Sequence, residues 1–200
     1  MKKLTTTGLA ALAVMLIALL AGPALAQSPT HDHVETHELP GHEVDDDTAF
    51  DELVRGIDVL ASREAMEQRI PDVMERLIDK AQNTEATVYE RWRATSLLGN
   101  FVEPEAEEAL RQLSADSEER IRAMAYYVLG AAFLKDGDDR LFAHLEAGLD
   151  DESHRVRADV VRSLGWTDHS QAPQLLESIA AGHDDERLET IAERALERLQ

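Results

Sequence analysis

Residues 121–130 read IRAMAYYVLG, and this stretch decides the fold because versions of it recur along the chain. Related stretches occupy residues 90–99, 156–165 and, in a degraded form, 188–196. Their shared features are an arginine, an Ala or Val three residues later, and a Leu seven residues later that precedes a glycine. In the last stretch Glu189 replaces the arginine and no glycine follows Leu196. Apolar residues three and four positions apart are typical of an amphipathic helix. Self-similarity at intervals of 31 to 35 residues predicts an array of stacked helical units.

A second predicted helix precedes each of these stretches. Its start is marked by Pro71, Pro104, Asp139 and Pro173, and proline suits the first helical position. Six residues after each start stands an aliphatic residue: Leu77, Leu110, Leu145 and Ile179. Each unit is therefore predicted to be a helix A, a short turn and a helix B. The glycines that close helix B are expected to adopt the left-handed conformation, and they are Gly99, Gly130 and Gly165.

The helix B pattern [VI]-R-x-x-A-x-x-x-L-G resembles the HEAT repeats, in particular their short bacterial form of the phycobilisome-lyase type, over roughly residues 64–200. The resemblance implies an all-α solenoid of about four helix pairs. The units are expected at about residues 64–100, 101–134, 135–168 and 169–200, within a repeat domain that covers residues 48–200. Thr48 to Ser62 is expected to form an N-terminal capping helix.

The resemblance also includes an acidic residue in the A–B turn, six residues before the helix B arginine. These pairs are Glu85 with Arg91, Asp116 with Arg122 and Asp151 with Arg157. We expect each acid to cap helix B and to meet the guanidinium of its own or of the next unit, which gives a structural ladder along one edge. His183 and Glu189 stand at these places in the fourth unit, which suits a terminal unit.

The exposed side of helix B is the candidate partner-binding face. Positions two before and five after the repeat arginine are seven residues apart and share the face turned away from the core. Besides Ser96 they hold Tyr89, Arg120, Tyr127, Arg155, Arg162, Arg187 and Arg194. In HEAT-like solenoids the B helices line the concave, partner-binding side, and Arg and Tyr are frequent at binding hot spots. The alternative is that these arginines only neutralise nearby carboxylates such as Glu119, Asp151, Glu186 and Glu193.

Composition excludes several classes of function. The formal charge is -20, with 20 Lys and Arg against 40 Asp and Glu, so binding to phosphate backbones or anionic membrane surfaces is not expected. The chain has no cysteine, which excludes disulfides, thiolate metal sites and a cysteine nucleophile. Trp92 and Trp166 are interpreted as packing residues at repeat junctions.

The first 26 residues are interpreted as a secretory signal peptide. Lys2 and Lys3 precede an apolar run from Leu9 to Ala21, and an A-x-A site ends at Ala26. Cleavage after Ala26 would raise the negative charge to -22, and the protein would be periplasmic or secreted. An uncleaved anchor is the alternative, although thirteen apolar residues are short for a span of about 20.

Residues 27–47 are expected to be a disordered His/Asp-rich linker because they contain few apolar residues and no apolar periodicity. Four histidines among seven carboxylates could capture Zn, Cu or Ni, and they are His31, His33, His37 and His42. A solvated acidic linker without metal is the other interpretation.

The sequence contains no phosphate-binding glycine loop, no H-E-x-x-H and no G-x-S-x-G motif. Two enzyme branches resemble this repeat. Bilin lyases act on cysteine-bearing proteins inside cells, and deoxyhypusine hydroxylase holds two irons with His-Glu pairs. The corresponding helix B starts here hold Glu90-Arg91, Ile121-Arg122, Val156-Arg157 and Leu188-Glu189. His144, His154, His169 and His183 are scattered and are expected to be solvated or local caps.

The sequence therefore favours an exported, non-catalytic scaffold or adaptor, not an enzyme and without a cofactor, that binds another protein or an acidic peptide through the helix B face. The alternative is a periplasmic metal-binding protein that uses the N-terminal histidines.

Overall fold

The computed structural model describes residues 45–56, 62–182 and 185–199, and all regular structure among them is helical. The predicted signal peptide and the four histidines of the predicted linker lie outside the described residues. The longer helices are α2 (Asp46–Arg55), α3 (Arg63–Arg69), α4 (Val73–Gln82), α5 (Val88–Leu97), α6 (Pro104–Leu113), α7 (Glu119–Val128), α8 (Asp139–Ala147), α9 (His154–Leu164), α10 (Ala172–Ala180) and α11 (Glu186–Leu199). Short 3₁₀ turns follow α5 and α8, at Leu98–Asn100 and Gly148–Asp150, and a π turn follows α7 at Leu129–Phe133.

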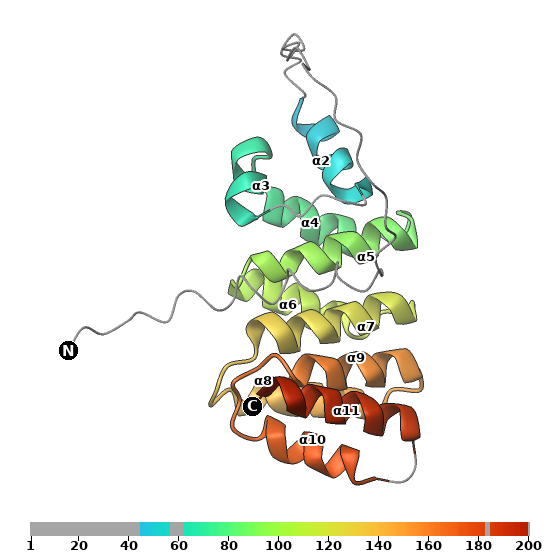
Figure 1. The fold of residues 1–200 in the computed structure, drawn as a ribbon. Helices are drawn as coiled ribbons and strands as arrows, with labels where there is room; N and C mark the ends of the chain where they lie inside the picture. The colour runs from blue at the N-terminus through green and yellow to red at the C-terminus, as the bar shows by residue number, and fades with distance from the viewer. Residues whose placement is uncertain (1–44, 57–61, 183–184, 200) are drawn as a thin grey trace, which may run out of the picture.

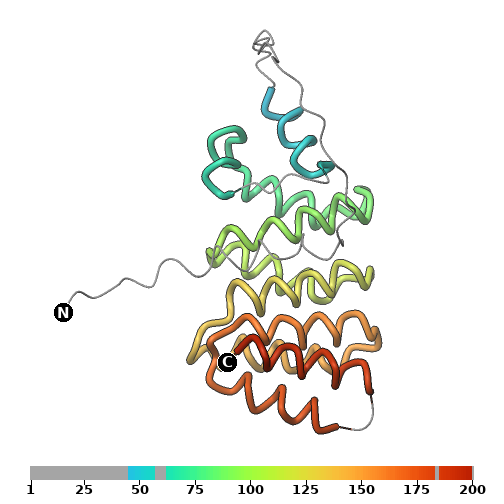
Figure 2. Tube along the Cα trace, in the orientation of Figure 1, coloured from blue at the N-terminus to red at the C-terminus, as the bar shows by residue number. Residues whose placement is uncertain are grey.

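The helices form a two-layer stack. α5, α7, α9 and α11 lie side by side as the B layer, with α4, α6 and α8 behind them (Figures 1 and 2). α5 packs on α7, α7 on α9 and α9 on α11, while each B helix also contacts a helix of the other layer. The all-α solenoid of helix pairs predicted from the repeat is confirmed: the pairs are α4/α5, α6/α7, α8/α9 and α10/α11.

The core lies between the two layers and repeats with the sequence. On α7 and just after it, Ile121, Ala125 and Leu129 are fully buried, and α9 buries Val156, Val160 and Leu164 at the same register. The A helices contribute Leu77, Leu110 and Leu145, which are also fully buried. Burial of one such side chain stabilises the fold by roughly 1.5–3 kcal/mol. Because adjacent units of a repeat protein bury these side chains against one another, each helix pair is stabilised mainly by its neighbours.

The repeat glycines serve a purpose different from the one expected. Among the described glycines only Gly137 has a positive φ, of 84°, so Gly99, Gly130 and Gly165 are not left-handed caps. A Cβ at Gly130 would instead lie 2.1 Å from Ser163 Oγ, and one at Gly165 would lie 2.9 Å from Ala195 Cα. Both neighbours belong to the next B helix. The glycines are therefore needed for close packing between successive units.

Helix starts follow the sequence at three places. α6 begins at Pro104, α8 begins at Asp139, and Pro173 lies in the first turn of α10. Pro71 instead precedes α4, whose N-cap is Asp72 with a left-handed φ of 51°. Proline thus lies at or near the start of three A helices and Asp139 begins the fourth, although the first A helix starts two residues later than expected.

The N-terminal cap consists of two helices and not of one helix over Thr48–Ser62. α2 already begins at Asp46, because the Asp45 side chain accepts hydrogen bonds from the N–H groups of Asp47 and Thr48. The structure therefore places residues 45–47 at the start of a helix, within the segment expected to be disordered. Ser62 caps the separate helix α3.

No helix in the described part of the chain combines the length and the apolar character needed to cross a membrane.

Candidate functional site

A ladder of arginine–aspartate pairs joins successive units at the A–B turns. Arg122 donates through Nε to Asp151 Oδ2 at 3.0 Å and through Nη2 to Asp151 Oδ1 at 3.1 Å. Arg91 is ion-paired with Asp116 through Nη1 and Nη2, and Arg157 Nη2 lies 3.7 Å from Asp185 Oδ2. Each arginine therefore reaches the acid of the next unit.

The same side chains also order the turns within each unit. Arg122 Nη1 donates to the Asp116 carbonyl at 2.9 Å, and Arg157 Nη1 donates to the Asp151 carbonyl at 2.7 Å. Asp151 Oδ1 accepts the N–H of Ser153 at 2.8 Å. The Arg122 guanidinium, and then the Ser153 N–H, hold the pKa of Asp151 below its usual value. Each rung is thus a clamp between two consecutive turns.

Two members of the expected ladder differ in the structure. Glu85 is exposed and its N–H donates to Asn83 Oδ1 at 2.9 Å, while Arg91 pairs with Asp116 of the next unit. In the fourth unit, Asp185 supplies the acid, whereas the predicted position, His183, lies outside the described residues. The Asp185 carboxylate also accepts the N–H groups of Arg187 and Leu188 at 3.2 Å. Its position directly before α11 is the sequence signal that identifies it.

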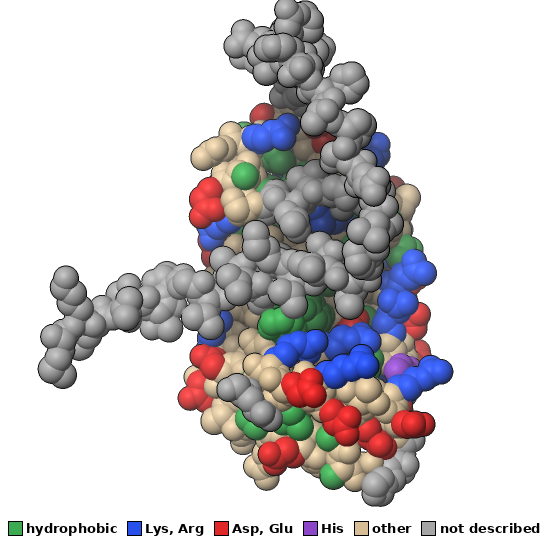
Figure 3. Space-filling view, in the orientation of Figure 1, with side chains coloured by type: hydrophobic (Ala, Val, Ile, Leu, Met, Phe, Trp, Pro, Cys, Tyr) green, Lys and Arg blue, Asp and Glu red, His purple; other side chains and the backbone are tan. Residues whose placement is uncertain are grey.

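The candidate partner-binding face lies on the outer side of the B helices. Tyr89 is 42% exposed and its ring lies 6.1 Å from that of Trp92, which is half-buried. Arg120, Arg155, Arg187 and Arg194 are exposed. Figure 3 has the B layer in front, and Lys and Arg side chains gather there at the level of α7 and α9, with Asp and Glu side chains below them. All five predicted residues are therefore exposed, and they stand on four successive B helices.

Tyr127 and Arg162 are less available than the other predicted residues of this face. Tyr127 is partly buried, and burial raises the pKa of its hydroxyl. Arg162 is ion-paired with Asp159 on its own helix, and burial raises the pKa of that carboxyl despite the pairing. Both side chains therefore contribute to contacts within the solenoid.

The described arginines fall into two groups, those whose side chains contact other described residues and those whose side chains do not. Away from this face, each forms an ion pair, a hydrogen bond, a ring contact or an electrostatic contact. On the face, Arg155 Nε lies 3.8 Å from Glu119 Oε1, and both side chains are about half exposed. Arg120, Arg187 and Arg194 form no such side-chain contact with any described residue. The expected alternative, neutralisation by nearby carboxylates, therefore does not account for these three.

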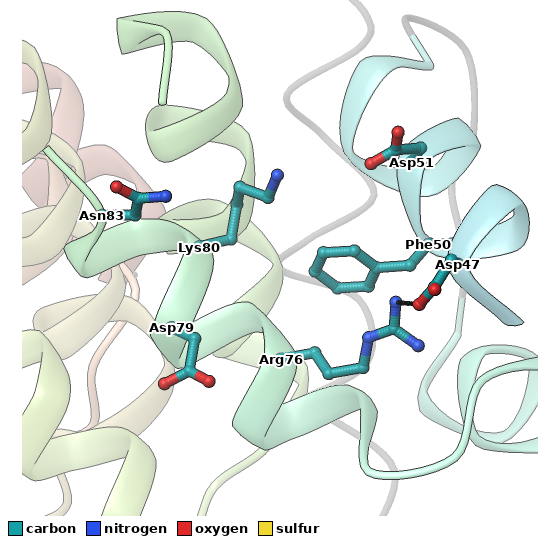
Figure 4. A pocket seen from close by; sticks show the side chains of 7 residues that line it. All are labelled: Asp47, Phe50, Asp51, Arg76, Asp79, Lys80 and Asn83. Atoms are coloured by element: carbon teal, nitrogen blue, oxygen red, sulfur yellow. Dashed lines mark hydrogen bonds and ion pairs between the residues drawn. The ribbon is translucent and has the colours of Figure 1, made fainter. Parts of the chain in front are cut away.

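A shallow pocket of about 330 Å³ lies elsewhere, between α2 and α4 (Figure 4). The Arg76 guanidinium lies 4.5 Å from the centre of the Phe50 ring and donates to Asp47 Oδ1 at 2.7 Å. The Arg76 and Asp47 side chains thus hold α2 against α4. The residues that line this pocket dock the N-terminal cap on the first unit. They do not converge on a point where a ligand could be held.

The histidines are placed in three unrelated environments. His144 Nε2 lies 3.0 Å from Ser114 Oγ, and burial lowers the pKa of this imidazole. His154 lies 3.5 Å from Asp185 at the last rung of the ladder. His169 is only 2% exposed and stacks on Phe142 at 4.5 Å, so it is not solvated. Its Nδ1 accepts the N–H of Gln171 at 3.3 Å just before α10, which agrees with the expected role as a local cap.

No group of three or more His, Asp or Glu side chains within the described ranges is positioned to hold a metal ion. The helix B starts do not fit the His-Glu pairs of a di-iron centre either. Glu90, which stands in such a position, is 9% exposed and accepts hydrogen bonds from Thr87 and from Arg55 of α2. Its carboxylate joins the N-terminal cap to the first unit, a role that the sequence pattern did not reveal.

Comparison with known proteins agrees with this architecture. The family of HEAT repeats matches residues 74–157. Among solved structures, human deoxyhypusine hydroxylase in complex with glycerol is similar, with a TM-score of 0.50 and 26% identity over 62% of this chain. The chain covers 42% of that protein's length. No curated protein matches the sequence.

The similar structure corrects one expectation. Deoxyhypusine hydroxylase is an enzyme with a HEAT-like fold, so the prediction that this chain is not an enzyme is contradicted. The prediction of HEAT repeats is supported by the family match and by the repeated helix pairs. The chain is thus an all-α solenoid of helix pairs, and its residues 74–157 match the family of HEAT repeats.

Proposed function

We propose that the protein is an exported helical-repeat scaffold or adaptor that binds another protein, or an acidic peptide of one, through the outer face of its B helices. Side chains on successive B helices form a continuous surface, because the units stack in register. Arginine and tyrosine contribute large contact areas together with hydrogen bonds, and this face carries both.

The observation that carries the proposal is the set of three exposed guanidinium groups of Arg120, Arg187 and Arg194, which form no side-chain contact with the residues that the structure describes. In a chain with 40 acidic and 20 basic residues, most arginines find a carboxylate within the fold. Exposed arginines that are not paired with a described carboxylate have their charge available for a ligand.

In-cell crosslinking tests the face directly. A photoreactive benzoylphenylalanine in place of Tyr89 should yield a discrete adduct with a partner protein. The same residue in place of Ala143, which is exposed on α8, should not. Replacement of Arg120, Arg187 and Arg194 by Gln should remove the adduct. An adduct that persists in this variant would count against the face.

The exported location rests on the sequence of residues 1–26. Cell fractionation followed by N-terminal sequencing tests it, and Gln27 should be the first residue of the extracytoplasmic form. A product that retains Met1 and stays in the cytoplasm would contradict this part of the proposal.

A second candidate function is metal capture by the His/Asp-rich tail, favoured by four histidines within twelve residues. Calorimetric titration of the mature chain with Zn, Cu and Ni should then release heat that is lost when His31, His33, His37 and His42 are replaced by Ala. Equal, negligible heats for both chains would exclude it.

A further inference from the structure

We infer that the ligand of this face is an acidic peptide of a partner protein in the polyproline II conformation, with a carboxylate at every third residue. This inference rests on the proposed function and specifies its ligand. The binding surface is the arginine row, defined as Tyr89, Arg120, Arg155 and Arg187, which stand two residues before the repeat position on α5, α7, α9 and α11.

Contacts near the helix starts show that the row is continuous. Arg155 Nε lies 3.8 Å from Oε1 of Glu119, the residue that precedes Arg120 on α7. Ser153, just before α9, donates its hydroxyl to Glu119 at 2.6 Å. Arg157 and His154 of α9 lie 3.7 and 3.5 Å from Asp185, the residue directly before α11. The starts of α7, α9 and α11 therefore lie next to one another.

The spacing of the row selects the peptide conformation. Packed helices lie about 8–10 Å apart, so successive arginines are offered at about this interval. A polyproline II helix has three residues per turn and a rise of about 3.1 Å, so every third side chain points the same way about 9 Å further along. In a β-strand the same face recurs every second residue, at about 6.7 Å, and an α-helix has a pitch of about 5.4 Å. Only the polyproline II repeat matches one carboxylate to each unit.

Three of the described carboxylates near the row already accept hydrogen bonds. Glu118 accepts the N–H of Arg120 at 3.4 Å, and Glu119 accepts the Ser153 hydroxyl. Asp185 accepts two N–H groups at the start of α11. The guanidinium groups of Arg120 and Arg187 have no described side-chain partner, which leaves their donors available to a ligand. The parallel row five residues after the repeat position is less suited, since Tyr127 is partly buried and Arg162 is paired with Asp159.

Tyr89 extends the row by one unit and changes its chemistry. Its exposed ring, next to Trp92, is a flat apolar surface of the kind on which proline-containing segments dock. The preferred peptide therefore carries a proline one turn, or three residues, beyond one end of the carboxylate series.

Two synthetic peptides of identical composition test the register. The first carries proline at position 1 and glutamates at positions 4, 7 and 10, and the second carries the glutamates at positions 4, 6 and 8. Fluorescence anisotropy with the mature chain, residues 27–200, in 0.15 M salt should show about tenfold tighter binding of the first peptide. At this salt the Debye length is about 8 Å, so the local row matters more than the net charge.

Matched variants assign the binding to the row. Replacing Arg120, Arg155 and Arg187 by Gln should abolish the tenfold preference. Replacing Arg69, Lys135 and Arg140 by Gln removes the same charge from exposed positions elsewhere and should leave it intact. Equal affinity for the two peptides would overturn the inferred register while the binding face stands. Absence of binding by either peptide would overturn both the inference and an acidic-peptide ligand.

The chain itself carries this spacing at Asp32, Glu35 and Glu38. The experiment is therefore repeated with these residues replaced by Asn, Gln and Gln. Similar affinity of the in-register peptide for both chains supports a partner peptide as the ligand. Binding only to the substituted chain would show that residues 32–38 occupy the row, and would overturn the assignment to a partner.

Discussion

Arg122 of one unit holds Asp151 of the next through two hydrogen bonds of 3.0 and 3.1 Å. Both side chains are largely buried, with 12% and 15% of their surface exposed. Because Nη1 of the same guanidinium bonds to the Asp116 carbonyl, one arginine joins two consecutive turns. Cohesion between units therefore depends on a polar edge as well as on the apolar core.

The first prediction concerns this rung. Asp151→Asn should lower the free energy of unfolding by about 1–3 kcal/mol, because a buried guanidinium loses its charged acceptor. Asp150→Asn, at the exposed neighbouring position, should change it by less than about 0.5 kcal/mol. Urea denaturation measures both. Similar values for the two variants would contradict a specific role of the ladder.

The second prediction concerns the repeat glycines. Gly130→Ala and Gly165→Ala should each destabilise the fold by about 1–3 kcal/mol, because the added Cβ would overlap Ser163 or the backbone at Ala195. Gly99→Ala should cost less, since its nearest contact is the Val128 side chain at 3.2 Å. Thermal unfolding of the three variants gives the order. A left-handed cap function would instead predict similar costs at all three positions.

The third prediction is a pH dependence from Glu90. Hydrogen bonds from Thr87 and then from Arg55 lower its pKa from 4.5 to about 2 in the folded protein. A depressed pKa stabilises the fold above the unfolded value of 4.5, and this stability is lost as the pH falls towards 2. Since Arg55 is 64% exposed, the effect should be about 1–2 kcal/mol.

Glu90→Gln tests this dependence. The difference in unfolding free energy between the wild type and this variant should shrink as the pH falls from 5 to 2. Because other lowered carboxyl groups are common to both chains, their contribution cancels in the difference. Parallel curves across this range would show that Glu90 does not anchor the N-terminal cap in the way described.

The fourth prediction separates the face from the ladder. Arg120→Gln, Arg187→Gln and Arg194→Gln should each change stability by less than about 0.5 kcal/mol, because these side chains form no described contact. Arg91→Gln should cost about 2 kcal/mol or more, since its guanidinium is buried against Asp116 and the Ala81 carbonyl. Urea midpoints measure the contrast. A large cost at Arg120, Arg187 or Arg194 would indicate a structural function of the face.

The apolar periodicity of the sequence predicted the fold well because the positions that recur as apolar are the ones buried in the core. The residues three and seven after the repeat position are apolar in each unit, and the residue one before it is apolar in every unit except the first, which has Glu90. In the second and third units the structure buries all three positions completely. The same register identified the outward positions of Arg120, Arg155 and Arg187. The positions of residues whose environment repeats in each unit could thus be predicted from the sequence alone.

Features that depend on contacts between residues of different units could not be predicted from the periodicity. The Gly130–Ser163 approach joins residues in different units, so the sequence could not distinguish a packing glycine from a cap. The register of the ladder, Arg91 to Asp116 and not to Glu85, depends on how one turn sits above the next. Glu90 occupies a position that is apolar in other units, and its burial is explained by the capping box with Thr87 together with the docking of Arg55.

The most direct test of the central claim is the affinity of the mature chain for an acidic peptide before and after Arg120, Arg187 and Arg194 are replaced by Gln. Fluorescence anisotropy in 0.15 M salt should show binding that weakens at least about fivefold in the variant, with unfolding unchanged. An unchanged affinity in a variant that remains folded would contradict the assignment of the B-helix face as the binding surface.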